Sequence, residues 1–388
     1  MQTAIKSMII RLFPTKEQER VMWNHVHAAR FIWNYMLDWQ IKRYDNGNGE
    51  KKFGKYDFTY RLPETKSQPE HAWLKDEISA TTLVHVCNNL GATYKRFLDG
   101  NIGRPKFKSR KKTRPSFPVR SDVGKIWFSE THVKVEKIGK IAYKTNYNIP
   151  LGNKVKFTNP VIAYTPNGKW ILTLGVECEN QAPMLTDKPM GIDLGIKELA
   201  VVAFGGDDLI FHNKNKSKDV RKLRRVLKHL QRNLSRKYKQ NGSYEETKNI
   251  KKLKEKIKRS YYHISNIQHD YIHQTTHKLI SLLPCKVTME DLNVKGMMKN
   301  RHLSKAIQEQ CFYEFRRQME YKCAWNGIEF VLADRWYPSS KICSCCGAYK
   351  KDLKLKDRTY ACSECGLKID RDYNAAINLM NYKVQSST

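Results

Sequence analysis

Four cysteines in the last fifty residues of the chain are spaced as two metal-binding pairs. Cys343 and Cys346 form one Cys-x-x-Cys pair, and Cys362 and Cys365 form a second pair after 15 intervening residues. Each pair places two thiolates on one side of a tight turn, and a hairpin of about 15–20 residues lets the pairs converge on a tetrahedral Zn²⁺. A four-thiolate site is closed to substrate, so we expect one structural zinc ion here.

A fifth cysteine, Cys345, lies inside the first pair, and we interpret it as a thiol that does not bind the metal. Its taking the place of Cys346 is the weaker alternative. A redox-active motif is another alternative, which two pairs at this spacing disfavour. The other five of the ten cysteines are scattered along the chain. A secreted disulfide framework would be spread more evenly, so the clustering indicates metal binding in a reducing compartment.

Three acidic positions suggest a second kind of metal site. Asp193 lies inside an apolar predicted strand, Glu290 ends another, and Asp372 stands with Asp370 at the start of the last predicted helix. Each alone could be a strand-end or helix-cap carboxylate. Carboxylates that converge from adjacent strands and a packed helix repel one another unless cations neutralise them. Two Mg²⁺ ions about 3.5–4 Å apart in such a site would activate a water and stabilise the leaving oxygen in phosphodiester hydrolysis.

The composition restricts the class of partner. The chain has 388 residues, with 71 Lys and Arg against 38 Asp and Glu, and a formal net charge of +33. A surplus of this size favours a polyanion, and nucleic acid is the leading candidate. No apolar run approaches the roughly 18 residues needed to cross a bilayer, and the first residues lack signal-peptide architecture. We therefore expect a cytosolic protein with no membrane partner.

Two basic segments are candidate nucleic-acid contacts. In residues 103–117, prolines prevent a helix and phenylalanines alternate with cations, a combination that favours nucleic-acid contact over a merely solvated surface. Residues 214–259 predict an antiparallel helical pair that buries an apolar seam and exposes a basic face. The candidate contacts are Arg104, Lys106, Lys108, Arg110, Lys111, Lys112, Lys222, Arg225 and Arg232.

The first part of the chain predicts a strand followed by helices. The strand spans residues 5–13, and a helix begins at Thr15, with Gln18 three residues later completing a capping box. Residues 46–70 are expected to be irregular because they are rich in Gly, Lys and Pro. A second helix begins after Ser79, where apolar residues recur at three- and four-residue spacing.

Alternating segments with turns between them predict a small β domain over residues 119–179. Two of its strands are expected at residues 154–159 and 161–166, separated by Pro160. Strands of this length and spacing are typical of a small antiparallel β-barrel or sandwich. A polar stretch after residue 179 predicts a domain boundary.

The remaining residues predict an α/β domain. Three consecutive strands begin near residue 190, and the helical pair follows them. A strand that ends in Glu290, a helix near residues 311–325, a strand at 328–335 and a final helix complete the series. This order of elements is typical of an RNase H-like fold, in which strands and a helix can bring the three acids together.

Several motifs, in order along the chain, resemble those of one family. They are GIDLGIKELAV, MEDLNVKGM, SSKICSCCG, CSECG and DRDYNAAIN, together with IIRLFPTKEQ and GRPKFKSRKK in the first third of the chain. The set resembles the TnpB proteins, the OrfB-type nucleases of bacterial and archaeal insertion sequences, and is more distantly similar to compact type V CRISPR effectors. The resemblance covers essentially the whole chain.

The resemblance implies an RNA-guided DNA endonuclease encoded by an insertion sequence. Its partners would be a guide RNA and double-stranded target DNA, its cofactors two catalytic Mg²⁺ ions and one structural Zn²⁺. Cleavage would occur next to a short flanking motif. By motif, the family's catalytic acids fall on Asp193, Glu290 and Asp372. We choose Asp372 over Asp370 because it directly precedes the segment Tyr373-Asn374-Ala375.

The resemblance also implies a multidomain α+β architecture. Residues 1–14 and 116–184 would form a wedge β-barrel into which a helical recognition domain, residues 15–115, is inserted. A RuvC-like nuclease domain would comprise residues 185–342 and 367–388. The zinc ribbon, residues 343–366, would be an insertion in it that binds target nucleic acid.

Three alternatives to a transposon-encoded nuclease remain. A nuclease-silent RNA-guided repressor is disfavoured because all three acids are present. A transposase that joins DNA ends is disfavoured because no separate helix-turn-helix is evident in the sequence. A compact type V CRISPR effector is the third alternative, and the short chain favours the transposon nuclease over it.

Overall fold

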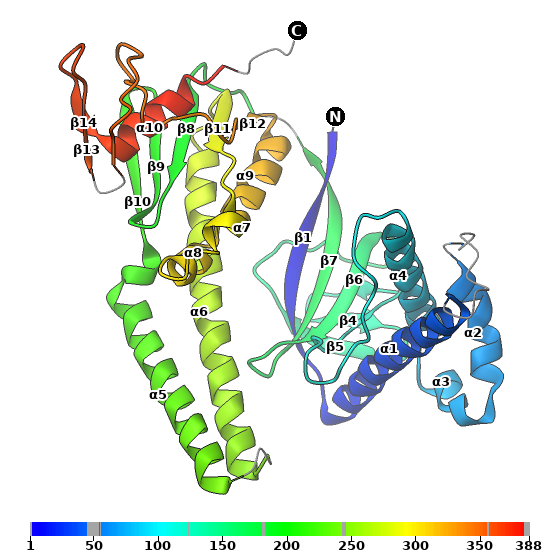
Figure 1. Cartoon of the computed structure of the whole chain (residues 1–388). Coiled ribbons are helices and arrows are strands. Elements are labelled where there is room, and N and C mark those ends of the chain that lie inside the picture. The colour runs from blue at the N-terminus through cyan, green and yellow to red at the C-terminus, as the bar shows by residue number, and fades with distance from the viewer. Residues whose placement is uncertain are drawn as a thin grey trace. The chain divides into compact units, whose positions relative to one another are not determined.

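The computed structural model describes residues 2–44, 54, 56–122, 124–180, 183–242, 246–354 and 357–383. The chain divides into two compact units, one of which is Thr3–Glu179 and the other Asn180–Thr388 with Met1–Gln2 (Figure 1). Within the described residues, no helix combines the length and the apolar character that a membrane span requires. The division into four functional domains stays a prediction.

The first unit is built on a seven-stranded sheet in the order β2-β6-β7-β1-β5-β4-β3. In the described residues this sheet has two ends, at β2 and β3, so the predicted barrel is observed as an open half-barrel. Its strands are β1 (Gln2–Phe13), β2 (Ser116–Pro118), β3 (Trp127–Phe128), β4 (His132–Val135), β5 (Gly139–Lys144), β6 (Phe157–Tyr164) and β7 (Trp170–Asn180).

Strand β6 is one strand where two were predicted. It pairs with β7 in antiparallel register, with a shift between Thr158 and Val161. Asn159 in that shift has a positive φ of 47°. A bulge of this kind lets the strand continue past Pro160, which has no N–H to donate to the ladder. The sequence pattern predicts a strand end at Pro160. The bulge that avoids this end depends on pairing with β7, which a local pattern does not show.

In the described residues of the first unit, four α-helices and one 3₁₀-helix accompany the sheet. They are α1 (Lys16–Arg43), α2 (Asp57–Ser67), η2 (Pro69–His71), α3 (Trp73–Asp76) and α4 (Ala80–Leu98). The predicted capping box is confirmed, since Gln18 N donates to Thr15 Oγ1 (3.3 Å) and Thr15 N donates to Gln18 Oε1 (3.0 Å). Helices α1, α2 and α4 pack on one another and share one hydrophobic core with the sheet.

Helix α2 lies where irregular chain was predicted, so that prediction is wrong for residues 57–67. Phe58, Leu62 and Thr65 are buried on one face of α2, at spacings of four and three residues. This burial stabilises the helix despite Pro63 in its interior, which removes one backbone hydrogen bond. Residues 46–53 and 55 of the segment predicted to be irregular lie outside the described residues.

The second unit is built on a five-stranded sheet in the order β10-β9-β8-β11-β12. The first three strands along the chain pair antiparallel, and β11 is parallel to both β8 and β12, as the predicted order of elements requires. The strands are β8 (Pro189–Leu194), β9 (Glu198–Phe204), β10 (Asp207–His212), β11 (Lys286–Glu290) and β12 (Glu329–Ala333).

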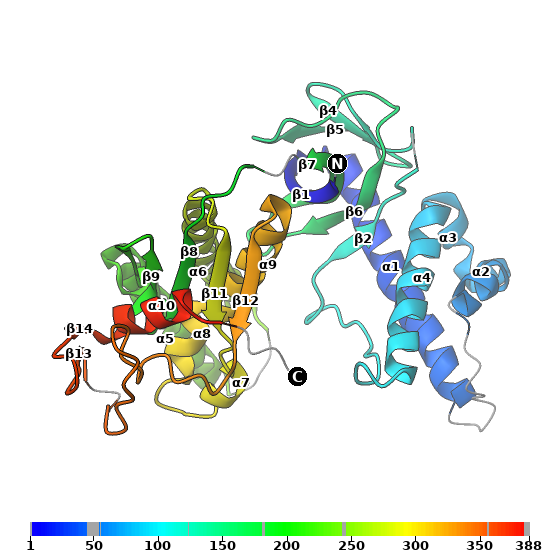
Figure 2. The ribbon, with the colours of Figure 1, turned by 90° about the horizontal axis from the view of Figure 1, so that it is seen from above.

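Different helices cover the two faces of this sheet (Figure 2). On one face, Ile192 of β8 packs in a core that α6 (Lys248–Ile280) and α9 (Phe312–Asn326) complete. On the other face, Val201 of β9 contacts Ala376 of α10 (Arg371–Met380). Side chains alternate between the faces of a strand. Asp193, which follows Ile192, therefore lies on the face that α10 covers.

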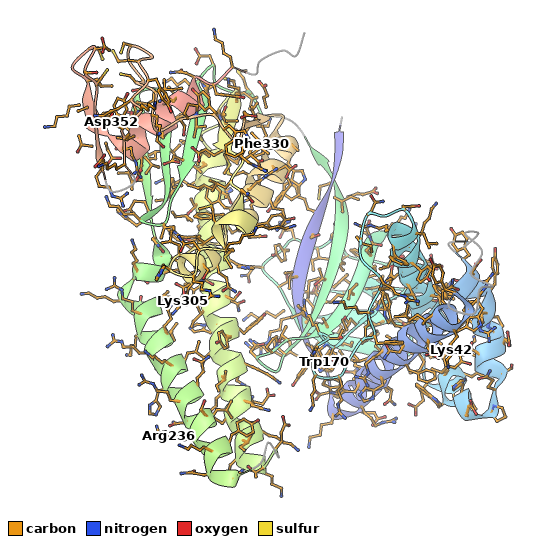
Figure 3. All side chains as sticks on the ribbon, viewed as in Figure 1. Lys42, Trp170, Arg236, Lys305, Phe330 and Asp352 are labelled. Atoms are coloured by element: carbon orange, nitrogen blue, oxygen red, sulfur yellow. The ribbon has the colours of Figure 1, made fainter. Side chains whose placement is uncertain are left out.

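Helix α6 is also half of the predicted helical hairpin. It packs against α5 (Lys218–Asn241) through a seam that contains Val220, Leu227 and Ile264, which confirms the antiparallel pair. The polar side chains of both helices extend outward from this seam, with Arg236 labelled on α5 (Figure 3). The remaining elements are η3 (Lys214–Lys216), α7 (Val294–Met297), α8 (Ser304–Gln310), β13 (Thr359–Ala361) and β14 (Lys368–Asp370).

Gly191 lets the backbone of α10 lie directly on β8. A Cβ atom at this position would be 2.0 Å from the carbonyl oxygen of Ala376, 2.3 Å from the amide nitrogen of Met380 and 2.9 Å from its Cα. These atoms belong to the helix backbone, so no side-chain rotation can relieve the overlap. Any side chain larger than hydrogen at residue 191 must displace α10 from the sheet.

We predict that Gly191→Ala destabilises the second unit by at least about 1–3 kcal/mol, the usual cost of overpacking. Gly103→Ala is the control, because a Cβ there meets no atom within 4 Å. Thermal unfolding of the two variants gives the difference in stability, and hydrogen exchange at residues 371–380 locates it. Equal melting temperatures and equal protection of α10 in both variants would contradict this account.

Candidate active site and cysteine cluster

Strands β8 and β11 place two of the predicted acids side by side. The two strands are parallel, and Met289 of β11 is the register partner of Ile192 of β8. The next residues along the strands are Glu290 and Asp193, which therefore lie at the same level at the carboxyl ends of the strands. Both side chains are half-buried. The register of β8 and β11 therefore places these two acids next to each other, as the sequence predicts.

Helix α10 brings Asp372 to the same end of the sheet. Asp372, Ala376 and Met380 are spaced by four residues and share one face of the helix. Ala376 and Met380 are the residues whose backbone contacts Gly191. Asp372 lies one turn before Ala376, and its negative charge is among the causes that raise the pKa of Asp193. The structure therefore gathers Asp193, Glu290 and Asp372 in one electrostatic site.

Asp370 has a structural role that the sequence left open. Its Oδ1 accepts hydrogen bonds from the backbone N–H of Asp372 (2.9 Å) and of Tyr373 (3.2 Å), so Asp370 is the N-cap of α10. An N-cap of this kind satisfies amides at the start of the helix that have no partner within it. The side chain of Asp372 is not needed for capping, and it faces the acidic site and two arginines.

The acidic site is electrostatically unfavourable. Burial raises the pKa of Asp193 well above its usual range, and the negative charges of Glu290 and Asp372 raise it further. Burial also raises the pKa of Glu290, while a hydrogen bond from Ser339 opposes that rise. Carboxylates in this arrangement bind protons or cations readily. Their oxygen atoms are the ligands that Mg²⁺ prefers in proteins, so the donor set fits that ion.

Two arginines pair with Asp372. Arg371 Nη2 lies 2.7 Å from Asp372 Oδ1, and Arg358 Nη1 lies 3.9 Å from Oδ2. The side chains of Arg371 and Asp372 are 14% and 17% exposed. The Arg371 charge also opposes the rise in the pKa of Asp193. A cation that is fixed beside the acids can attract a phosphate to their edge.

Ser339 is a site residue that the sequence analysis missed. Its hydroxyl donates to Glu290 Oε1, and its side chain is almost fully buried. The bond joins residues that are 49 positions apart in the chain, so no periodic pattern predicts it. The one hint in the sequence is that Ser339 opens the motif SSKICSCCG. Ser339 fixes the orientation of the Glu290 carboxylate.

Helix α10 holds the segment that leads from Ser339 into the first cysteine pair. We call residues 339–344 the approach segment. Asn378 Nδ2 donates to the carbonyl oxygens of Ser339 and Ile342, both at 2.7 Å. Asn374 Nδ2 donates to Ile342 O (2.7 Å), and its Oδ1 accepts from Ser344 N (3.0 Å). The approach segment thus connects Glu290, α10 and the cysteine cluster.

The two Cys-x-x-Cys pairs converge as predicted. The four sulfur atoms of Cys343, Cys346, Cys362 and Cys365 lie within 4.8 Å of one another. The distances Cys343–Cys365 and Cys346–Cys362 are both 3.6 Å between Sγ atoms. Zn–S bonds of about 2.3 Å place tetrahedral sulfurs about 3.8 Å apart. The cluster fits that geometry, and Cys345 is exposed and outside it.

Backbone amides favour a thiolate at one cysteine of the second pair, Cys362. The N–H of Cys365 and that of Glu364 lower the pKa of Cys362 to about 7, against the opposing effect of burial. A lowered pKa gives the deprotonated sulfur that metal binding needs.

Among the residues that the structure describes, no three carboxylates approach one another as closely as these four sulfurs.

The basic segment after residue 103 is fastened to α1. Trp33 Nε1 donates to Lys106 O (3.1 Å), and Asn34 exchanges hydrogen bonds with the backbone of Lys108 at 2.7 and 3.0 Å. Lys108 Nζ lies 3.6 Å from the centroid of the Trp33 ring, and burial lowers its pKa to about 8. Lys108 therefore packs within the protein.

The other predicted nucleic-acid contacts are exposed. Arg104 lies with its guanidinium 5.8 Å from the ring of Tyr44, at the end of α1. The three predicted cations of α5 lie away from the apolar seam. The exposed candidates are Arg104, Lys106, Arg110, Lys111, Lys112, Lys222, Arg225 and Arg232. Their contact with nucleic acid stays a prediction.

We predict that Asp193→Asn stabilises the protein in a chelating buffer at pH 8, by about 1 kcal/mol, because it removes a charge from the acidic site. The raised pKa of Asp193 in the folded state sets the pH dependence. Wild-type stability falls as the pH rises above the ordinary pKa of Asp, about 4, toward the raised value. The advantage of the variant is therefore larger at pH 8 than at pH 5.

Melting temperatures in EDTA at the two pH values measure this effect. Asp208→Asn is the matched control, since Asp208 is exposed on β10 of the same sheet. An Asp193→Asn variant that is less stable than wild type at pH 8, or a gain that does not change between pH 5 and pH 8, would refute the electrostatic account.

Three family models match parts of the chain. The model described as "Helix-turn-helix domain" matches residues 1–49, "Probable transposase" matches residues 173–301, and "Cas12f1-like, TNB domain" matches residues 312–379. In residues 2–44, which are the described part of the first match, the structure has strand β1 and the single helix α1. This part is therefore not a helix-turn-helix.

Relatives match the chain over nearly its whole length. A protein of Streptomyces pristinaespiralis named "Putative RNA-guided DNA endonuclease" is 30% identical over 98% of this chain and 90% of its own length. "Putative RNA-guided DNA endonuclease InsQ" of Escherichia coli is 28% identical over 97% of this chain and 92% of its own.

One solved structure has a similar fold throughout. It is Cas12f1, determined by cryo-EM in a complex with sgRNA and target DNA, and it covers 98% of this chain and 99% of its own with a TM-score of 0.63. The sequences are 12% identical, so this likeness concerns the fold. The near full-length relatives indicate the same family as the motifs that lie on β8, β11 and α10. This chain belongs to the TnpB (OrfB-type) family of insertion-sequence proteins.

Proposed function

We propose that this protein is an insertion-sequence-encoded, RNA-guided DNA endonuclease that cleaves DNA paired to its guide. The observation that carries the proposal is the gathering of Asp193, Glu290 and Asp372 at one end of a sheet, in a chain whose near full-length relatives are named as RNA-guided DNA endonucleases. The strand order β10-β9-β8-β11-β12, with β8, β11 and β12 parallel, supports an RNase H-like, RuvC-type nuclease domain.

The residues of the acidic site would have different roles in phosphodiester hydrolysis. Asp193, Glu290 and Asp372 would hold two Mg²⁺ ions, which when bound supply an activated water and stabilise the leaving oxygen. Ser339 holds Glu290 in place by donating a hydrogen bond to it. Arg371 sets a positive charge beside Asp372, where it can bind the phosphate that is cut. Packing of α10 on Gly191 keeps Asp372 at the same end of the sheet as Asp193.

The guide RNA would carry the sequence information. In this division of labour, base pairing selects the target and the protein binds the heteroduplex backbone and a short flanking motif. The net charge of +33 and the exposed cations of α5 and of residues 103–112 support phosphate contacts of this kind. The half-barrel and the helices of the first unit would correspond to the wedge and recognition domains.

The cysteine cluster would hold one structural Zn²⁺. The spacing of its sulfurs fits a four-thiolate site. The cluster would keep the approach segment folded, and that segment bonds to Glu290 through Ser339 and to α10 through Asn374 and Asn378. The zinc would therefore support the nuclease site without taking part in the reaction.

A transposase that joins DNA ends directly is the alternative that uses similar metal chemistry. The segment that matches a helix-turn-helix model consists, in residues 2–44, of β1 and α1, and β1 belongs to the seven-stranded sheet. A strand in a sheet cannot serve as the first helix of an end-binding motif. This observation favours the nuclease.

We predict that the purified protein carries RNA with a defined scaffold and a variable end, and that this complex cuts DNA that matches the variable end in Mg²⁺. Asp193→Ala is expected to reduce cleavage by at least about 100-fold, because one carboxylate of the metal site is lost. The variant should keep its RNA. Random cellular RNA in the wild-type complex, or undiminished cutting by the variant, would refute the proposal.

We predict that Cys365→Ser lowers the zinc content from one equivalent per chain to near zero and also reduces cleavage, because the approach segment loses its anchor. Cys345→Ser is the matched control, since Cys345 lies outside the cluster. Elemental analysis gives the zinc content, and a cleavage assay gives the activity. Unchanged zinc in Cys365→Ser, or equal loss of zinc in Cys345→Ser, would contradict the assignment of ligands.

A further inference from the structure

A groove of about 550 Å³ adjoins Glu290 in the second unit. Its lining includes residues 334–341, from the loop between β12 and the cysteine cluster, and Tyr349, Leu353 and Lys354 from the cysteine-cluster region. Glu290 and Arg371 line the end of the groove at the acidic site, and Trp336 and Tyr349 contribute aromatic rings to its walls. The groove therefore joins the proposed cleavage site to two large aromatic side chains.

Trp336 lines the groove, and 85% of its surface is exposed to solvent. Its backbone is nevertheless well fixed. Trp336 N donates to Asp334 Oδ1 (2.8 Å), and Tyr337 N donates to Asp334 O (2.9 Å). Three residues after Trp336, Ser339 bonds to Glu290. A hydrogen-bonded turn thus presents an exposed indole ring three residues before Ser339, which contacts the acidic site.

Cations flank this ring. Arg335, the residue before it, pairs with Asp291 at 2.5 Å, and Asp291 also pairs with Arg316 at 2.7 Å. Lys341, which also lines the groove, lies with its Nζ 5.8 Å from the ring centroid of Tyr349. Exposed aromatic faces among cations form the usual surface for unpaired nucleotides, because bases stack on the rings and phosphates contact the cations.

A protein ligand fits this groove less well. The aromatic rings are exposed singly among charged side chains and do not form the continuous apolar patch that a protein partner would cover. The groove also leads to carboxylates and to Arg371, which suit a phosphate and its cations. An unpaired DNA strand supplies both the bases for the rings and a phosphate for the acidic site.

We propose that Trp336 is a stacking platform that holds one unpaired base of the DNA strand next to the phosphate that is cut. This inference rests on the proposed nuclease function and deepens it. The stacked base fixes the position of the neighbouring phosphate at Glu290 and Arg371. Stacking on an indole face does not depend on base identity, so the subsite accepts any sequence that the guide selects.

The test uses the full-length protein with its co-purified RNA and a matching DNA duplex. Trp336→Ala is expected to reduce kcat/KM by about five- to 150-fold, the equivalent of about 1–3 kcal/mol of stacking, whereas Trp336→Phe keeps most of the activity. Ile210→Ala is the control, since Ile210 is 50% exposed on β10 of the same unit and does not line the groove. Melting temperature and zinc content of all three variants should equal those of the wild type.

A second measurement separates stacking from any indirect effect. Single abasic nucleotides are placed in turn along the cleaved strand. Wild-type cleavage is expected to slow sharply at one position next to the cut, and Trp336→Ala should be insensitive at that position because the partner ring is already absent. Equal rates for Trp336→Ala and wild type, or the same abasic profile for both, would overturn the subsite while leaving the nuclease intact. Absence of cleavage by the wild type would instead overturn the proposed function.

Discussion

The contact between the backbone of α10 and Gly191 of β8 determines how the rest of the second unit is arranged. Because residue 191 has no side chain, Ala376 and Met380 lie directly on the strand. One face of α10 then carries Asp372 toward Asp193. An adjacent face presents Asn374 and Asn378 to the approach segment. A single close contact therefore sets the position of a candidate catalytic acid and of the segment that leads to the cysteine cluster.

The acidic site shows a conflict between stability and function. Burial and like charges raise the pKa of Asp193, so the folded protein carries an unfavourable group that it could avoid with a neutral residue. The surroundings limit this cost locally. Ser339 donates to Glu290, and Arg371 neutralises part of the charge on Asp372. Strain of this kind, confined to a few carboxylates on a well-packed sheet, is typical of sites that bind cations.

The sequence predicts those parts of the site that follow from local patterns. Asp193 could be located because it lies inside an apolar strand, Glu290 because it ends another, and the cysteine cluster because its spacing is diagnostic. Ser339, Asn374 and Asn378 could not be located, because their roles depend on hydrogen bonds between segments that are 32 to 49 positions apart. Local patterns also do not show where tertiary contacts override the preference of a short segment.

Two parts of the fold illustrate this limit. Helix α2 forms despite Pro63 because Phe58 and Leu62 are buried against its neighbours, and the bulge at Asn159 carries β6 past Pro160 because β7 holds both halves. In each case a proline predicts an interruption, and packing against a partner element removes it. Lys108, a predicted nucleic-acid contact, shows an effect of packing on a side chain, since it is half-buried and its ammonium group lies 3.6 Å from the centroid of the Trp33 ring.

Helix α6 runs through both the basic hairpin and the core beneath the five-stranded sheet. Its 33 residues make a rod about 50 Å long. At one end Ile250 packs within the basic hairpin, and at the other Ile272 and Leu279 lie in the core beneath β8 and β11. The rod has no break at the boundary between hairpin and core. The basic hairpin and the layer beneath the two strand-borne carboxylates are therefore built on one continuous helix.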